Sequence, residues 1–308
     1  MRVVRVHVRG PRRSADPTHT ATLRARYESD MARRFERLAK AIEEEVGKRN
    51  GFGLMPTGTR AANIVRIHRG EFEFVTLEEK VRSFMRWLRR RADAGILEIQ
   101  RGTPLEQAAR RSWQNVYIDT AYQRGIADAG RKLRGAGADV KESWVRGAFN
   151  RPVHADRIGI IYTRAFSDLK AITEHMDRRI SAILAEGLAE GFGPMDLARK
   201  LSTGVRSISR TRAKVLARTE VINAHAEATL NAFEEAQVAG VEVESEFATA
   251  RDAQVCPECE ELEGRTFTLV EARGIIPVHP NCRCAWLPAL MNADGLELNR
   301  RWRRRRAA

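Results

Sequence analysis

Apolar side chains recur at helical spacing through most of the first 240 residues of this chain. The first stripe advances in steps of three or four residues and comprises Leu23, Tyr27, Met31, Phe35, Leu38, Ile42 and Val46. Such steps follow one face of an α-helix, and the other faces carry charges such as Arg33 and Arg37. The pattern predicts a long amphipathic helix that packs against partner helices and ends near Asn50.

Two capping motifs predict the next helices. Thr76 with Glu79 forms a capping box before an apolar stripe that runs to Leu88, and residues 71–75 form either a short strand or an extended lead-in. Thr103 with Glu106 forms a second box, with Pro104 at the first helical position. We expect one helix from this second box to the break at Gly135–Gly137.

Three more helices are predicted before Gly240. A stripe extends from Ile158 to Ile183, and the break at residues 191–194 precedes a short helix through Leu201. The last long helix is predicted for Ser209–Ala239.

The pattern changes after Gly240. Val241, Val243 and Phe247 alternate with acidic residues as in a strand, and a second apolar stretch surrounds Trp286. The predicted fold class is therefore mainly α, with long amphipathic helices followed by a small α+β C-terminal cap at residues 241–290 that a zinc ion could staple. The predicted domains are a basic N-terminal arm (1–20), a helical domain (21–150), a domain at 151–290 that includes the cap, and an arginine-rich tail (291–308).

Positive charge is concentrated in three stretches. The 308 residues contain 54 Lys and Arg against 40 Asp and Glu, a net charge of +14. Residues 1–13, 80–91 and 300–306 hold no acidic residue and together account for more than this excess. They are either solvated faces with a solubilising tail or surfaces that attract a polyanion such as DNA or RNA.

The two ends of the chain carry the predicted nucleic-acid contacts. Guanidinium groups bind phosphates by releasing counterions, and one tryptophan could stack on a base. The predicted contact residues are Arg2, Arg5, Arg9, Arg12, Arg13, Arg300, Arg301, Trp302, Arg303, Arg304, Arg305 and Arg306. No apolar run reaches the length of a membrane helix and no signal peptide is recognised, so we expect a protein of the cytoplasm or of a particle.

All four cysteines lie within one short segment. Cys256 and Cys259 form one pair, Cys282 and Cys284 form a second, and His279 lies three residues before Cys282. Two thiolate pairs can meet on one tetrahedral ion, which resembles a structural zinc site with four of these five residues as ligands. Packed thiols and a disulfide are the alternatives. A closed site of four ligands would stabilise the cap and take no part in catalysis.

Motifs for nucleotide hydrolysis or α/β-hydrolase chemistry are absent from the sequence, which contains no phosphate loop, dinucleotide fingerprint, nucleophile elbow or zincin helix. His279 with Asn281 leaves a zinc-dependent nuclease as an alternative, although no second histidine lies nearby to complete such a site. Arg218 and Glu220 on the last long helix favour an ion pair or interhelical contact over a catalytic pair.

The order of several motifs resembles that of the phage head morphogenesis, or Mu F-like, minor head proteins. The similarity covers about residues 150–290, and Phe247 stands where the family often has tryptophan. The residues that carry it are Ala217, Arg218, Thr219, Glu220, Asn223, Phe247, Thr249, Asp252, the Cys256–Cys259 motif, Leu262, Gly264, Pro277, the His279–Cys284 segment and Pro288.

This resemblance implies a minor capsid protein of the virion with no enzymatic activity. It implies association with the portal protein inside the capsid, contact with double-stranded DNA during assembly, packaging or ejection, and further contacts with scaffold or major capsid protein. The host cytoplasm would hold the protein before assembly. A nuclease acting on phage DNA and a host regulatory DNA-binding module are the alternatives from other functional classes.

Overall fold

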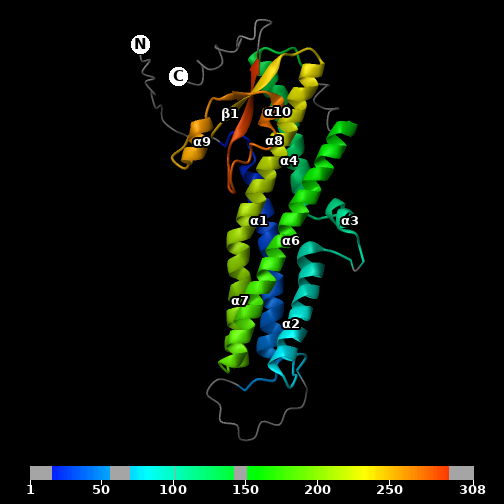
Figure 1. Ribbon diagram of the computed structural model, residues 1–308, viewed down its shortest axis with the longest axis vertical. Coiled ribbons are helices and arrows are strands. Elements are labelled where there is room, and N and C mark those ends of the chain that lie inside the picture. The colour runs from blue at the N-terminus through cyan, green and yellow to red at the C-terminus, as the bar shows by residue number, and fades with distance from the viewer. Residues whose placement is uncertain (1–15, 56–69, 101, 142–150, 291–308) are drawn as a thin grey trace. The chain divides into compact units, whose positions relative to one another are not determined.

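Helices form most of the described chain. The computed structural model describes residues 16–55, 70–100, 102–141 and 151–290. Its helices in these ranges (Figure 1) are α1 (Ala21–Ile42), α2 (Leu77–Ala92), α3 (Leu105–Arg110), α4 (Asn115–Ala136), α6 (Pro152–Ala189), α7 (Pro194–Ile208) and α8 (Lys214–Val238). Short π-helical segments follow three of them: η1 (Glu43–Lys48), η2 (Asp93–Leu97) and η3 (Ser209–Ala213).

A small α+β region follows α8. It contains β1 (Val243–Ala248), α9 (Pro257–Leu262), β2 (Thr266–Phe267), α10 (Leu269–Ala272) and β3 (Ala285–Leu290). The predicted fold class, mainly α with a small C-terminal α+β cap, is therefore confirmed.

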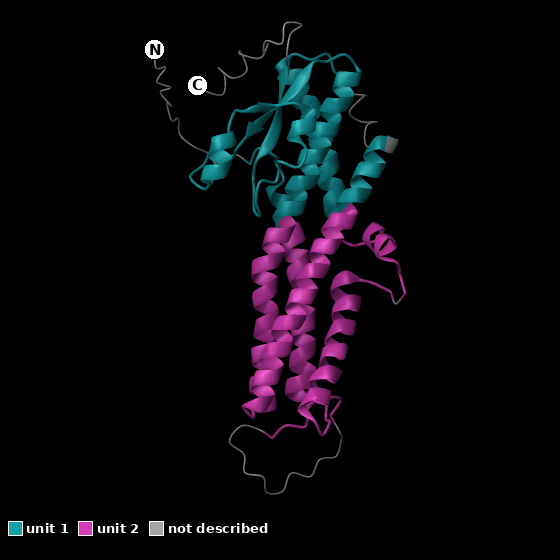
Figure 2. Cartoon of the chain, viewed as in Figure 1, with its two compact units in different colours: residues 1–25, 116–161, 218–308 teal, residues 26–115, 162–217 magenta. Residues whose placement is uncertain are grey.

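The chain divides into two compact units, each assembled from separate stretches of sequence (Figure 2). Unit 1 comprises residues 1–25, 116–161 and 218–308, and unit 2 comprises residues 26–115 and 162–217. Both units combine residues from before and after position 150. The domain boundaries expected from the sequence stay a prediction.

Unit 2 is a helical bundle whose core contains the apolar stripe of the first helix. Tyr27, Met31, Phe35 and the later stripe residues to Val46 are all buried, as predicted. Apolar residues of α2, α6 and α7 are buried with them, among them Leu88, Met176 and Leu201. Each such side chain contributes about 1.5–3 kcal/mol when it is fully buried. Packing against these partner helices stabilises the first helix.

Aromatic rings pack against each other in one part of the unit 2 core. The ring centroid of Phe52 lies 5.0 Å from that of Phe72 and 5.6 Å from that of Phe84. The backbone N–H of Phe72 donates to Gly51 O at 2.7 Å. Residues 71–75 form no strand; Glu71 and Phe72 lie in a turn, in which the backbone N–H of Glu73 donates to Gly70 O at 3.1 Å. The Thr76–Glu79 capping box then opens α2 as predicted.

The second predicted capping box does not form, and the helix predicted from it is interrupted. Pro104 occupies the N-cap of α3 without a side-chain hydrogen bond, and α3 ends at Arg110. The side-chain amide of Asn115 donates to Ala109 O at 2.8 Å and to Arg110 O at 3.1 Å. These bonds satisfy carbonyls that a continuing helix would have used, so α4 begins separately at Asn115.

The later helices follow the prediction with one difference in length. The stripe from Ile158 to Ile183 lies in α6. Pro194 occupies the first turn of α7 after an N-cap glycine, as predicted, but α7 continues past Leu201 to Ile208. The predicted helix at Ser209–Ala239 is α8, preceded by the π-helical turn η3.

Unit 1 contains a three-stranded antiparallel sheet with the order β2-β1-β3. Phe247 of β1 pairs with Trp286 of β3, and their ring centroids are 5.6 Å apart. One buried cluster joins the sheet to α4 and α8 through residues such as Leu133, Ile222 and Phe233. The same cluster includes three cysteines, so the sheet and these helices together position the cysteine-rich segment.

Candidate metal centre

The first cysteine pair lies at the start of α9. Cys256 is the N-cap residue in an extended conformation, and Pro257 begins the helix with its fixed φ. The backbone N–H of Cys259 donates to Cys256 Sγ at 3.4 Å. This first turn therefore places both sulfur atoms on the same side of the short helix.

The second pair follows a tight turn that leads into β3. The backbone N–H of Cys282 donates to His279 O at 3.1 Å, and Asn281 adopts a left-handed φ of 68°. Asparagine tolerates this conformation better than most residues. Strand β3 begins at Ala285, directly after Cys284, and holds this end of the turn in the sheet.

The fold brings all five predicted donor residues together. Cys256, Cys259 and His279 form one group of donors, and Cys259, Cys282 and Cys284 form another, with the ligand atoms of each group within 4.8 Å of one another. The Nε2 atom of His279 lies 3.2 Å from Cys256 Sγ and 3.3 Å from Cys259 Sγ. Cys259 belongs to both groups and is their common member.

The imidazole of His279 has its unprotonated nitrogen directed toward the sulfur atoms. Its Nδ1 atom lies 2.8 Å from Pro280 O, and a carbonyl oxygen can only accept a hydrogen bond. We therefore assign the proton to Nδ1, which leaves the lone pair of Nε2 facing Cys256 and Cys259. A backbone carbonyl that fixes the tautomer in this way is a common partner of a metal-binding histidine.

Three of the thiols, those of Cys259, Cys282 and Cys284, have pKa values shifted from the ordinary thiol value. Hydrogen bonds, the largest from the Cys284 side chain, lower the pKa of Cys282 to about 5. Burial raises the pKa of Cys259 to about 12, and the hydrogen bond with Cys282 raises the pKa of Cys284. Because metals bind the thiolate form, a bound cation would release protons from these thiols.

The donor set fits a tetrahedral metal. All four cysteines are free thiols, and Cys259, Cys282 and Cys284 are buried. Bond lengths of about 2.0–2.3 Å to zinc place neighbouring donors about 3.3–3.8 Å apart. The distances of 3.2 Å and 3.3 Å from His279 Nε2 to the two sulfur atoms are close to this range. The cluster can therefore hold a metal ion through four of its five donors.

Two residues of the upstream motif support the same turn. Thr219 Oγ1 in α8 accepts a hydrogen bond from the backbone N–H of Asn281 at 3.4 Å. Arg283 forms a two-point ion pair with Asp252, with Nη2 2.6 Å from Oδ1. These contacts connect α8 and the segment before α9 to the loop between the two cysteine pairs.

The remaining motif residues have different environments. Glu220 and Asn223 are buried in α8, and Arg218 lies in the same helix. Glu220 is no surface ion-pair residue, because its side chain is 0 % exposed. The structure places this part of the motif inside unit 1.

Sequence reasoning missed two buried histidines of unit 1. His154 is hydrogen-bonded between Tyr122 and Glu235. His225 lies 3.8 Å from Asp128, and burial together with the charge of Lys132 lowers its pKa to about 3. Each is a single histidine within a helical pattern, so no spacing signal could have identified it.

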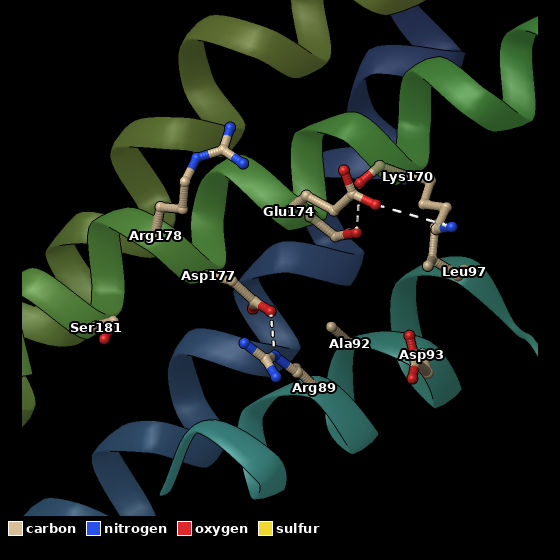
Figure 3. Close-up of a pocket in the computed structure, with 10 residues that line it drawn as sticks. Arg89, Ala92, Asp93, Leu97, Lys170, Glu174, Asp177, Arg178 and Ser181 are labelled. Carbon is tan, nitrogen blue, oxygen red and sulfur yellow. Dashed lines mark hydrogen bonds and ion pairs between the residues drawn. The ribbon is translucent and has the colours of Figure 1, made fainter. Parts of the chain in front are cut away.

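Unit 2 contains a polar cleft of about 660 Å³ between α2 with η2 and α6 (Figure 3). Arg89 Nε lies 2.6 Å from Asp177 Oδ2, and Lys170 lies 3.8 Å from Glu174. Burial raises the pKa of both Asp93 and Asp177. Most of the lining charges are thus paired with each other, as expected for a hydrated gap between helices.

The predicted nucleic-acid contacts at both chain ends, Arg2 to Arg13 and Arg300 to Arg306 with Trp302, lie outside the described residues. The basic face of α2 lies within them: Arg82, Arg86 and Arg90 are exposed. None of the helices in the described ranges combines the length and apolar character needed to cross a bilayer.

One comparison with known proteins gives a match. Residues 178–287 match the family model described as phage Mu protein F like protein. This segment includes the Arg218–Asn223 motif and all five metal donors, so the Mu F-like resemblance is confirmed over it and supports a phage head morphogenesis protein. No curated protein and no solved structure gives a significant match.

Proposed function

We propose that this chain is a minor capsid protein of a tailed phage that acts in head morphogenesis as a structural component without enzymatic activity. The observation that carries the proposal is the match of residues 178–287 to phage Mu protein F like proteins. The contacts from Thr219 to Asn281 and from Asp252 to Arg283 link the motifs of this segment in space.

In this proposal the cysteine cluster holds one structural zinc ion. Zinc accepts thiolate and imidazole donors in tetrahedral geometry, and the cluster offers both. Four ligands leave no open coordination position for a substrate. The ion would then connect α9 to the turn before β3 and stabilise the cap.

The proposed partners are the portal protein, with scaffold or major capsid protein as further ones, and packaged double-stranded DNA. Helical surfaces of unit 2 would contact the portal, and the arginine-rich ends would contact DNA without sequence specificity. The exposed basic face of α2 and the net charge of +14 support attraction to a polyanion. Such contacts would place the protein inside the capsid near the portal, after a period in the host cytoplasm.

Deletion of the gene from the phage tests the role in assembly. We expect purified particles to contain the protein, and particles made without it to be fewer or to contain abnormal amounts of DNA. Portal pull-down from infected cells should recover the wild-type protein. Absence of the protein from particles, no recovery with the portal, and normal DNA content after deletion would together refute the proposal.

A cleavage assay separates the structural role from that of a nuclease. Purified protein is incubated with plasmid DNA and divalent metal ions, with His279→Ala as the paired variant. We expect no cleavage by either protein. Cleavage by the wild type that is lost in His279→Ala would favour the nuclease instead.

A further inference from the structure

A histidine and an arginine meet on the surface of unit 2, away from the cysteine cluster. The Nε2 atom of His175 in α6 lies 3.5 Å from Nη2 of Arg212 in η3. Arg178 and Arg179 follow His175 by three and four residues in α6, so they extend the same helix face by one turn. We call these four residues, His175, Arg178, Arg179 and Arg212, the arginine patch.

The guanidinium groups of the arginine patch lack acidic partners. All three arginines are exposed, and within the described ranges none of them forms an ion pair. Other arginines of unit 2 do: Arg89 pairs with Asp177, and Arg206 bridges Glu36 and Glu43. Figure 3 shows that the Arg178 side chain points away from the Arg89–Asp177 pair.

Positive charges lie near His175 on its own helix, α6, and on η3. Burial lowers the pKa of His175, and the charges of Arg212, Arg178 and Arg179 lower it further. The nearest acidic residues of α6, Glu174 and Asp177, have Lys170 and Arg89 as partners. Like charges gathered in this way repel each other, and an external anion would relieve that repulsion.

The chemistry of the arginine patch favours phosphate over a protein surface. Guanidinium groups bind phosphate oxygens through paired hydrogen bonds. Protein interfaces are usually anchored by buried aromatic or apolar side chains. In the described part of the chain, the exposed large apolar residues lie elsewhere, for example at Val75, Met195 and Val238.

We propose that the arginine patch binds the phosphate backbone of double-stranded DNA. This site lies in the helical bundle and is separate from the arginine-rich ends. The inference rests on the proposed function for its choice of DNA as the polyanion. The chain termini are already expected to contact DNA. The arginine patch adds a contact surface formed by side chains of α6 and η3.

The test is the salt dependence of DNA binding by the full-length protein. Arg178→Gln, Arg179→Gln and Arg212→Gln are combined in one variant. A matched variant combines Arg33→Gln, Arg110→Gln and Arg199→Gln, which removes the same charge from exposed arginines of unit 2 that pair with Asp30, Glu106 and Asp196. Binding of a short duplex is measured by fluorescence anisotropy over a series of salt concentrations.

We expect the patch variant to lose about two to three units of slope in the plot of log K against log salt, because each phosphate contact contributes about 0.9. Its affinity at low salt should fall at least about tenfold, while the matched variant should lose less than about one unit of slope. Equal slopes for the two variants would overturn the proposal. So would unchanged DNA binding together with lost portal recovery by the patch variant, since the patch would then bind protein.

Failure of this inference can be distinguished from failure of the proposed function. Incorporation of the protein into particles tests the head role without reference to the patch. A protein that enters particles normally while both variants bind DNA alike would refute only the arginine patch. A protein absent from particles, not recovered with the portal and without effect on DNA content would refute the head role, and the slope would still report on the patch.

Discussion

The phenolic oxygen of Tyr122 in α4 lies 2.8 Å from Nδ1 of His154 in α6. The other ring nitrogen of His154 lies 3.1 Å from a carboxylate oxygen of Glu235 in α8, and the side-chain amide of Asn231 donates to Tyr122 at 2.7 Å. Because a carboxylate accepts, Nε2 of His154 donates and Nδ1 accepts from Tyr122. This chain of hydrogen bonds connects three helices inside unit 1.

Removing the Tyr122 hydroxyl should destabilise unit 1. In Tyr122→Phe the buried Nδ1 of His154 loses its donor and Asn231 loses its acceptor. We expect the free energy of unfolding to fall by about 1–3 kcal/mol, measured by urea denaturation. Val116→Ala, an exposed change in the same helix, is the control and should shift it by less than about 0.5 kcal/mol. Equal effects of the two changes would contradict the assigned network.

Asp16 should make stability depend on pH at the start of α1. It accepts hydrogen bonds from the Thr18 hydroxyl at 2.7 Å and from Thr20 N–H at 2.9 Å, and pairs with Arg24 at 3.1 Å. Burial raises the pKa of Asp16, but the Thr18 hydrogen bonds and the Arg24 charge outweigh it, so that pKa is lowered overall. The native state therefore binds fewer protons than the unfolded state.

The stabilisation by Asp16 is fully present above its unfolded pKa and is lost as pH falls through the lowered native value. We expect Asp16→Asn to lower the free energy of unfolding by about 1–2 kcal/mol at neutral pH. The difference from wild type should shrink below about pH 4. Urea denaturation at a series of pH values checks this, and a difference that stays constant with pH would contradict it.

Two glycines of α4 should respond in opposite ways to alanine. A Cβ atom at Gly125 would lie 2.5 Å from the carbonyl oxygen of His225 and 2.7 Å from Cβ of Ala228, so α4 and α8 would have to separate. We expect Gly125→Ala to destabilise the protein by about 1–3 kcal/mol. A Cβ at Gly135 meets nothing within 4 Å, and Gly135→Ala should stabilise α4 by about 0.5–1 kcal/mol. Thermal denaturation of both variants is the measurement, and equal shifts would contradict the close contact.

Cys259 should be the most sensitive donor of the metal centre. It belongs to both groups of converging ligands, whereas His279 belongs to one. We expect about one equivalent of zinc per chain, lost on Cys259→Ser together with thermal stability. His279→Ala leaves four thiols and should retain more zinc. Glu260→Gln, an exposed change in α9, is the control.

Elemental analysis of freshly purified proteins gives the zinc content. A chelator should lower the melting temperature of the wild type and of Glu260→Gln, and leave that of Cys259→Ser unchanged. Full zinc content in Cys259→Ser would contradict its shared position. Absence of zinc from the wild type, with unchanged stability of the serine variant, would leave the cysteines as packed thiols.

Local sequence predicted the helices whose apolar side chains repeat at three and four residues. The stripe from Leu23 to Val46 is buried along its whole length, and the Thr76–Glu79 box forms as expected. The break after Arg110 was missed because Asn115 satisfies the helix carbonyls there, a contact that periodicity does not reveal. The cysteine cluster was predicted because each pair, Cys256 with Cys259 and Cys282 with Cys284, is closely spaced and lies beside a proline that favours a turn. Both features are local.

Local sequence patterns specify where most helices lie, which face of each is apolar, and which five side chains could hold a metal. Which distant residues meet depends on the packing of the helices. It joined Tyr122 to His154, placed Thr219 against the Asn281 turn, and gathered Arg212 with His175, Arg178 and Arg179. The physical reason is that helix periodicity and capping depend on neighbours within a few residues, whereas these contacts depend on how separate helices pack.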